Sequence, residues 1–175
     1  MKFPAVDGLR PTSDRMRETL FNWLTPVLSG ARCLDLFAGS GALGFEAASR
    51  GAAHVVMVER DPRVLRALGE NRRALAADQV EVIEGEAQGR LAGYPGRFDV
   101  VFLDPPFSEP NLLARAVELL VAGKHLKDDA RVYVELPAGH ALAAVPAGWE
   151  LYREKRAGAV HYLLYRVHRS PFSLY

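Results

Sequence analysis

The spacing of hydrophobic residues along this chain switches between the pattern of a buried strand and that of an amphipathic helix. Continuous apolar runs, typical of buried strands, lie at 32–37, 54–58, 79–83, 99–103 and 131–135. Segments with apolar residues at every third or fourth position predict helices over about 12–28, 44–50, 61–76 and 110–121. Because Pro26 lies in the last turn of the first helix, we expect regular helix there to end near Leu24.

Two further apolar runs close the chain, and no helix separates them. Residues 149–156 and 160–167 alternate between apolar and polar positions and meet at Ala157-Gly158, which predicts a β-hairpin. The strand and helix order before it is typical of a doubly wound α/β sheet, mostly parallel with an antiparallel C-terminal hairpin at one edge. A length of 175 residues, 49% of them hydrophobic, predicts one domain over 13–175 after an N-terminal arm at 1–12.

Charge is balanced overall but unevenly distributed along the chain. The net charge is +1, so any binding to a polyanion must come from local patches. Such patches occur at 50–73, where six arginines face three acids, and at 152–169, where five basic residues face one acid. Basic surface of this kind is compatible with RNA binding, although a run of charges is more often a solvated face.

The remaining composition argues against several classes of site. The single cysteine, Cys33, excludes an internal disulfide and a cysteine-based zinc site. The five histidines show no spacing typical of metal ligands, so no metal is expected. No signal-peptide pattern opens the chain, and no apolar run approaches the ~18 residues that a membrane span needs. We therefore expect a soluble, cytoplasmic protein with no membrane partner.

The segment Asp104-Pro105-Pro106-Phe107 follows the fourth apolar run and is the most informative stretch of the chain. Two consecutive prolines end the strand and fix a stiff corner at the carboxyl edge of the sheet, where open α/β sheets bind ligands. Asp104 and the Pro105 carbonyl can accept the two hydrogens of an exocyclic amine while Phe107 stacks on a base. The alternative is a strand that ends at proline, with Asp104 capping the next turn.

A glycine-rich turn follows the first apolar run. Gly39, Gly41 and Gly44 satisfy the dinucleotide pattern G-x-G-x-x-G, which is a weak signal by itself. Glycines here allow a ligand to approach the backbone closely. Asp35 lies four residues before Gly39, and its carboxylate favours a ligand with an ammonium group and disfavours a pyrophosphate.

Two more acids follow the next strands. Glu59 ends the second strand, a position that suits an acceptor for both ribose hydroxyls of a nucleoside; the alternative is a surface acid paired with Arg60 or Arg63. Glu86, after the third strand, can accept a hydrogen bond from an adenine amino group. Glu84 can fill that role instead, or both acids can be merely exposed.

Together these motifs resemble a known family. Asp35-x-Phe37-x-Gly39-x-Gly41, Glu59 and the proline corner resemble class I S-adenosylmethionine-dependent methyltransferases with a Rossmann-like sheet that modify exocyclic amines of bases. Residues 10–24 (RPTSDRMRETLFNWL), 34–44 (LDLFAGSGALG) and the closing Gly158-x-Val160-x-Tyr162-x-Leu164-Tyr165 resemble, more narrowly, the RsmD family. The resemblance extends from residue 9 to residue 166.

The resemblance implies an enzyme that methylates the N2 amine of one guanine in 16S ribosomal RNA, with S-adenosylmethionine as cofactor. It implies catalytic roles for Asp104, Pro105 and Phe107, and cofactor contacts for Asp35, Phe37, Gly39, Gly41, Glu59, Arg60, Glu86, Ala87, Thr12 and Arg15. Thr12 can equally be a helix cap, and Arg15 part of a solvated face. We expect the assembled small ribosomal subunit to be preferred over free RNA, and a monomer.

The chain departs from the family pattern in two places. Family members usually begin with a longer basic arm, which is an expected RNA contact and is absent from this sequence. They also commonly carry aspartate where this chain has Glu86. Two other functions stay open: a nicotinamide-dependent oxidoreductase, which uses the same glycine pattern and Glu59, and an RNA-binding module without catalysis on the same fold.

Overall fold

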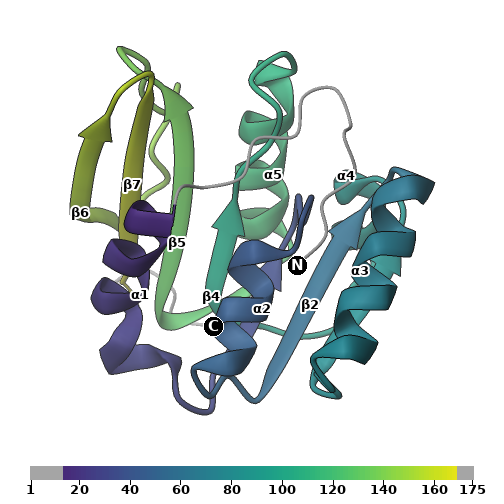
Figure 1. The fold of residues 1–175 in the computed structure, drawn as a ribbon. Coiled ribbons are helices and arrows are strands. Elements are labelled where there is room, and N and C mark those ends of the chain that lie inside the picture. Colours follow the sequence, from purple (N-terminus) through teal and green to yellow (C-terminus); the bar gives the residue numbers. More distant parts are fainter. Residues whose placement is uncertain (1–13, 169–175) are drawn as a thin grey trace.

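Seven strands form one sheet with helices on both faces, as Figure 1 shows for the computed structural model. The structure describes residues 14–168. Its elements are α1 (Asp14–Leu28), β1 (Arg32–Asp35), α2 (Ala42–Ser49), β2 (His54–Glu59), α3 (Pro62–Ala74), β3 (Val80–Glu84), α4 (Ala87–Ala92), β4 (Phe98–Leu103), α5 (Pro110–Ala122), β5 (Leu126–Pro137), β6 (Trp149–Ala157) and β7 (Val160–Val167).

The strand order in the sheet is β3-β2-β1-β4-β5-β7-β6. Strands β1 to β5 pair in parallel, whereas β7 lies antiparallel between β5 and β6. The doubly wound sheet and its antiparallel C-terminal hairpin at one edge are therefore confirmed. From β1 the chain adds β2 and β3 on one side and then β4 and β5 on the other, so the strand order reverses between β1 and β4. Ligands of such folds bind at the carboxyl ends of the strands beside this point.

Each face of the sheet has its own hydrophobic core. Helices α1, α2 and α3 cover one face, where Leu20, Phe45 and Leu68 belong to one buried cluster. Helices α4 and α5 cover the other face, where Leu91 and Leu120 belong to a second cluster. Strands covered on both sides are buried throughout, which explains why their sequences are continuous apolar runs.

Two element ends differ from the sequence prediction. Strand β1 ends at Asp35 and not at residue 37, because the chain then turns between β4 and β2: the Leu36 N–H bonds to β4 and the Ala38 N–H to β2. Helix α1 continues past Pro26 to Leu28. A proline in the last turn removes only one helical hydrogen bond, and the buried Leu28 side chain holds that turn in the core.

Two further elements exceed what periodicity predicted. Helix α4 was not predicted, since six residues are too few to show a helical repeat. Strand β5 is 12 residues long and begins at Leu126, although its exposed Asp128 and Asp129 interrupt the apolar pattern. Among residues 14–168, no helix has the length and apolar character required to cross a bilayer.

Candidate active site

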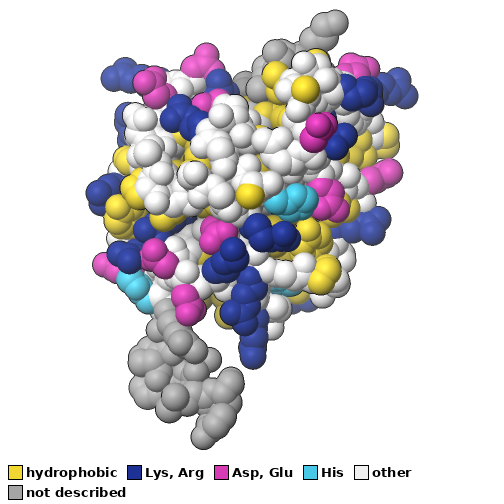
Figure 2. Space-filling model, turned by 90° about the horizontal axis from the view of Figure 1, so that it is seen from below, with side chains coloured by type: hydrophobic (Ala, Val, Ile, Leu, Met, Phe, Trp, Pro, Cys, Tyr) yellow, Lys and Arg dark blue, Asp and Glu magenta, His cyan; other side chains and the backbone are white. Residues whose placement is uncertain are grey.

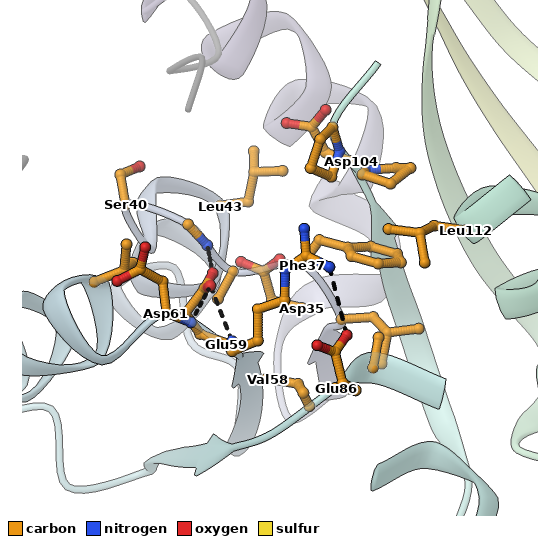
Figure 3. Close-up of a pocket in the computed structure, with 18 of the residues that line it drawn as sticks. Asp35, Phe37, Ser40, Leu43, Val58, Glu59, Asp61, Glu86, Asp104 and Leu112 are labelled. Carbon is orange, nitrogen blue, oxygen red and sulfur yellow. Dashed lines mark hydrogen bonds and ion pairs between the residues drawn. The ribbon is translucent and has the colours of Figure 1, made fainter. Parts of the chain in front are cut away.

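A cavity of about 160 Å³ opens at the carboxyl ends of β1, β2, β3 and β4 (Figure 3). The motifs singled out in the sequence meet here, although they are spread over seventy residues. The residues that line the cavity are Asp35, Leu36, Phe37, Ala38, Gly39, Ser40, Ala42, Leu43, Val58, Glu59, Arg60, Asp61, Val64, Gly85, Glu86, Ala87, Asp104, Pro105, Pro106 and Leu112.

The glycine turn forms one wall of the cavity because its small residues let the backbone lie close to the space. Gly39 and Gly41 have φ angles of 53° and 79°, a region that favours glycine. A Cβ atom on Gly41 would lie 2.6 Å from both Leu68 and Phe45. Gly41 itself does not line the cavity; it lets the chain pass tightly from the turn into α2.

Asp35 lies at the floor of the cavity and is only 2% exposed. Its Oδ2 atom accepts the Gly44 N–H at 3.2 Å. Burial raises the pKa of Asp35 to about 7, and the charges of Glu59 and Glu135 raise it further, while the hydrogen bond from Gly44 opposes them. The Asp35 carboxylate is therefore poised to gain a proton near neutral pH unless a cationic ligand binds beside it.

Glu59 is held by backbone N–H groups on both of its carboxylate oxygens. Oε2 accepts the Gly39 N–H at 2.9 Å, and Oε1 accepts those of Arg60 and Asp61 at 2.9 and 3.0 Å (Figure 3). Arg63, a partner considered from the sequence, forms its ion pair with Asp61 instead. Glu59 thus links the glycine turn to the end of β2 and faces the cavity as an oriented acceptor.

Arg60 closes one side of the cavity by joining two segments that follow other strands. Its guanidinium forms an ion pair with Glu109, just before α5, and a second with Glu86 at 3.5 Å. The hydrogen bond with Glu109 raises the pKa of Arg60 and lowers that of Glu109. Of the two acids after β3, Glu86 lines the cavity, whereas the exposed Glu84 does not.

The proline corner forms the opposite wall. Asp104 and Pro105 both line the cavity, Asp104 partly exposed and Pro105 buried. Phe107 does not line this cavity. It lines a second, largely apolar cavity of about 820 Å³, which Pro105 and Pro106 also line. The corner therefore lies between two adjoining spaces: Asp104 lines the first, Phe107 lines the second, and Pro105 lines both.

Three predicted site residues in the described part of the chain do not line the cavity: Gly41, Phe107 and Arg15. Thr12, like the whole arm 1–12, lies outside the described residues. Arg15 is exposed in the first turn of α1 and does not line the cavity. Conversely, Ser40 and Leu112 do line it and were missed. Ser40 stands inside the glycine turn, which was a usable signal, whereas nothing in the local sequence marks Leu112.

Figure 2 views the opposite side of the molecule, at the amino ends of the parallel strands. Lys and Arg side chains there stand among Asp and Glu side chains. Lys127 pairs with Asp99 at 2.8 Å, and His54 lies 3.1 Å from Glu81. Acidic side chains thus offset part of the positive charge at this end, and the cavity lies at the other end of the strands.

Comparison with known proteins agrees with this geometry. A family model described as "Conserved hypothetical protein 95" matches residues 1–166. The ribosomal RNA small subunit methyltransferase D of Escherichia coli (strain K12) is 48% identical over 167 residues, which make up 94% of this chain and 84% of that protein. The protein of the same name from Haemophilus influenzae is 46% identical over 171 residues, 94% of this chain and 88% of that one.

Solved structures of similar proteins support the same assignment. A putative methyltransferase, yhhF from Escherichia coli, matches with a TM-score of 0.87 and 45% identity over 96% of this chain and 92% of that one. A putative O-methyltransferase from Klebsiella pneumoniae, only 15% identical, shares the fold with a TM-score of 0.73 over 95% and 84%. The chain therefore belongs to the family described as conserved hypothetical protein 95, the RsmD family, and is a methyltransferase.

Proposed function

We propose that this protein transfers a methyl group from S-adenosylmethionine to the exocyclic N2 amine of a guanine in 16S ribosomal RNA. The proposal rests on the negative charge of the residues that line the cavity. Five carboxylates line it, and among the described residues Arg60 is the single basic one, already paired with two glutamates. Such a site suits a ligand with a sulfonium and an ammonium group and repels the pyrophosphate of a nicotinamide dinucleotide.

The residues that line the cavity match separate parts of S-adenosylmethionine. Asp35, which is buried and accepts a hydrogen bond from the Gly44 N–H, suits the ammonium group. Glu59 suits the ribose hydroxyls, because backbone N–H groups fix both of its oxygens in place. Further contacts with the methionine and adenine parts are proposed for Phe37, Gly39, Arg60, Glu86 and Ala87, which line the cavity, while Gly41 supports the turn behind them.

When bound, S-adenosylmethionine supplies an electrophilic methyl group, and the electron pair of the broken carbon–sulfur bond stays on sulfur. Guanine N2 is a weak nucleophile because its lone pair is delocalised into the ring. Asp104 and the Pro105 carbonyl would accept its two hydrogens, direct the lone pair toward the cavity and stabilise the positive charge that develops on nitrogen. The amine then loses one proton to Asp104 or to water, and Phe107 stacks on the base.

The RNA assignment is supported by the relatives, which are named as small-subunit ribosomal RNA methyltransferases. The target guanine has to leave its stack to reach Asp104, which costs a few kcal/mol unless it lies in a loop. The structural context of the RNA sets that cost, so the assembled small ribosomal subunit is the expected substrate. We expect the enzyme itself to be a cytoplasmic monomer. The roles expected of Thr12 and Arg15 at the mouth of the site stay predictions.

The test is transfer of labelled methyl from S-adenosylmethionine to small ribosomal subunits from cells that lack this protein, followed by nucleoside analysis. We expect N2-methylguanosine at one position, and a lower rate on free 16S RNA. Label in another nucleoside would overturn the guanine assignment. Failure to bind S-adenosylmethionine would favour an RNA-binding module without catalysis, and a fluorescence change with reduced nicotinamide would favour the oxidoreductase.

A further inference from the structure

A second carboxylate lies beside Asp104 on the neighbouring strand. The register of the sheet pairs Phe102 with Tyr133 and Leu103 with Val134. The next residues of the two strands, Asp104 and Glu135, are therefore neighbours across the sheet. They follow Phe102 and Tyr133 by two positions, so they belong to the face of the sheet that α1 covers. Neither the strand prediction nor the family motif drew attention to Glu135.

Glu135 is held in a defined place in the core. Its side chain is only 2% exposed, and its Oε1 atom accepts the Tyr133 hydroxyl at 2.8 Å. Burial raises the pKa of Tyr133, and the charges of Glu135 and Asp104 raise it further; the charge of Glu135 also raises the pKa of Asp35. Glu135 thus stands within electrostatic reach of the cavity floor, and it lines the second cavity together with Pro105 and Phe107.

The bases that carry an exocyclic amine differ in the atom next to it. On the Watson–Crick edge of guanine, the group next to the N2 amine is N1–H, a donor. In adenine and cytosine the neighbours of the amine, N1 and N3, are acceptors. Two carboxylates side by side can accept from both donors of guanine, whereas the second carboxylate would face a lone pair of adenine or cytosine. A buried polar group left unpaired discriminates strongly against the wrong ligand.

We propose that Glu135 accepts the N1–H of the target guanine beside Asp104 and thereby selects guanine over the other amine-bearing bases. The inference rests on the proposed function and names the residue that gives it base specificity. Tyr133 is a positioning residue: its hydroxyl holds one oxygen of Glu135, and its ring lies in the aromatic cluster with Phe102 and Tyr162. Bases extruded from RNA are commonly read on this edge.

The experiment replaces one base in the substrate. After the methylated position has been mapped, small subunits are reconstituted with 16S RNA that carries either guanine or 2-aminopurine at that position. 2-Aminopurine keeps the exocyclic amine but has a lone pair at N1 in place of N1–H. Methylation rates are measured for the wild type, for Glu135→Gln and for Glu70→Gln, an exposed acid on α3 that serves as the matched control.

We expect the wild type and Glu70→Gln to prefer guanine by about 10- to 100-fold. In Glu135→Gln the amide can donate to N1 of 2-aminopurine, so the preference should fall at least about tenfold while affinity for S-adenosylmethionine stays unchanged. Loss of O6 in 2-aminopurine affects all three proteins equally, so the change in ratio reports on position 135. Tyr133→Phe should lower the rate on guanine and weaken the preference only in part.

Two outcomes would overturn the inference. One is a wild-type enzyme that methylates 2-aminopurine within about threefold of guanine, a result that does not depend on any variant folding. The other is an unchanged preference in a folded, active Glu135→Gln. If the wild type fails to methylate guanine in these subunits, the proposed function has failed instead, which keeps the two conclusions distinguishable.

Discussion

The carboxylate of Glu59 holds the glycine turn in place, since its Oε2 atom accepts the Gly39 N–H at 2.9 Å. The two residues are 20 positions apart and belong to the ends of neighbouring strands. The same side chain is the proposed acceptor for the ribose hydroxyls. One residue thus shapes the turn and presents the acceptor, so structure and binding should fail together when it is removed.

Replacement of Glu59 by alanine should therefore weaken both binding and stability. We expect the dissociation constant for S-adenosylmethionine to rise about 10- to 100-fold, because two charge-assisted hydrogen bonds are lost. The melting temperature should fall by several degrees because backbone N–H groups lose their acceptor. Isothermal titration calorimetry and thermal unfolding measure the two effects. Glu84→Ala, at an exposed acid outside the cavity, is the control and should change neither.

Binding of S-adenosylmethionine should depend on pH through Asp35. The pKa of Asp35 is raised to about 7 in the folded protein, and only its ionised form attracts an ammonium group. Affinity should hence be full above about pH 8 and fall about tenfold for each pH unit below 7. Calorimetric titrations across this range test the prediction, and an affinity that stays flat down to about pH 5 would contradict it.

Stability should show the opposite dependence. The pKa of Asp35 in the folded protein lies above its ordinary value of 3.8, so the folded state binds a proton that the unfolded state releases between about pH 4 and 7. The Asp35 contribution to the free energy of unfolding therefore decreases as pH rises through this window. Asp35→Asn should raise the free energy of unfolding at about pH 8 by ~1–2 kcal/mol while abolishing cofactor binding. Denaturant titrations with and without the substitution measure this difference.

Asp104→Ala should separate chemistry from cofactor binding. Asp104 is the proposed acceptor for the amine hydrogens, and the Pro105 carbonyl alone cannot stabilise the developing charge. We expect turnover to fall at least about a thousandfold, with the dissociation constant for S-adenosylmethionine changed less than about threefold. Single-turnover methylation and calorimetry give the two values. An equal loss of both would instead assign Asp104 a structural role.

Two glycines should respond oppositely to alanine. Gly41 has a φ of 79°, and an added Cβ would meet Leu68 and Phe45 at 2.6 Å, so Gly41→Ala should destabilise the fold by ~2–3 kcal/mol. Gly89 lies in α4 with nothing within 4 Å of an added Cβ, so Gly89→Ala should stabilise by ~0.5–1 kcal/mol. Thermal unfolding of both variants checks the contrast, which would be refuted if Gly41→Ala matched the wild type.

The sequence by itself determined the sheet and the edge at which the site lies. Apolar runs separated by helical repeats predict parallel strands, and the carboxyl ends of parallel strands meet at one edge. That rule is enough to bring Asp35, Glu59 and Asp104 to a common cavity, as the structure finds. The stiff turn at the proline corner followed from local geometry, since two prolines fix their own backbone.

Only the tertiary structure decided which distant residues touch. The ion pair of Arg60 with Glu109 spans 49 residues and depends on where α5 begins relative to β2. The placement of Glu135 beside Asp104 depends on the register of β4 against β5, and a shift of one residue would turn its side chain to the other face. Periodicity reports which face of its own element a residue occupies. It carries no information on register between elements, and that register decides whether Glu135 lies beside Asp104.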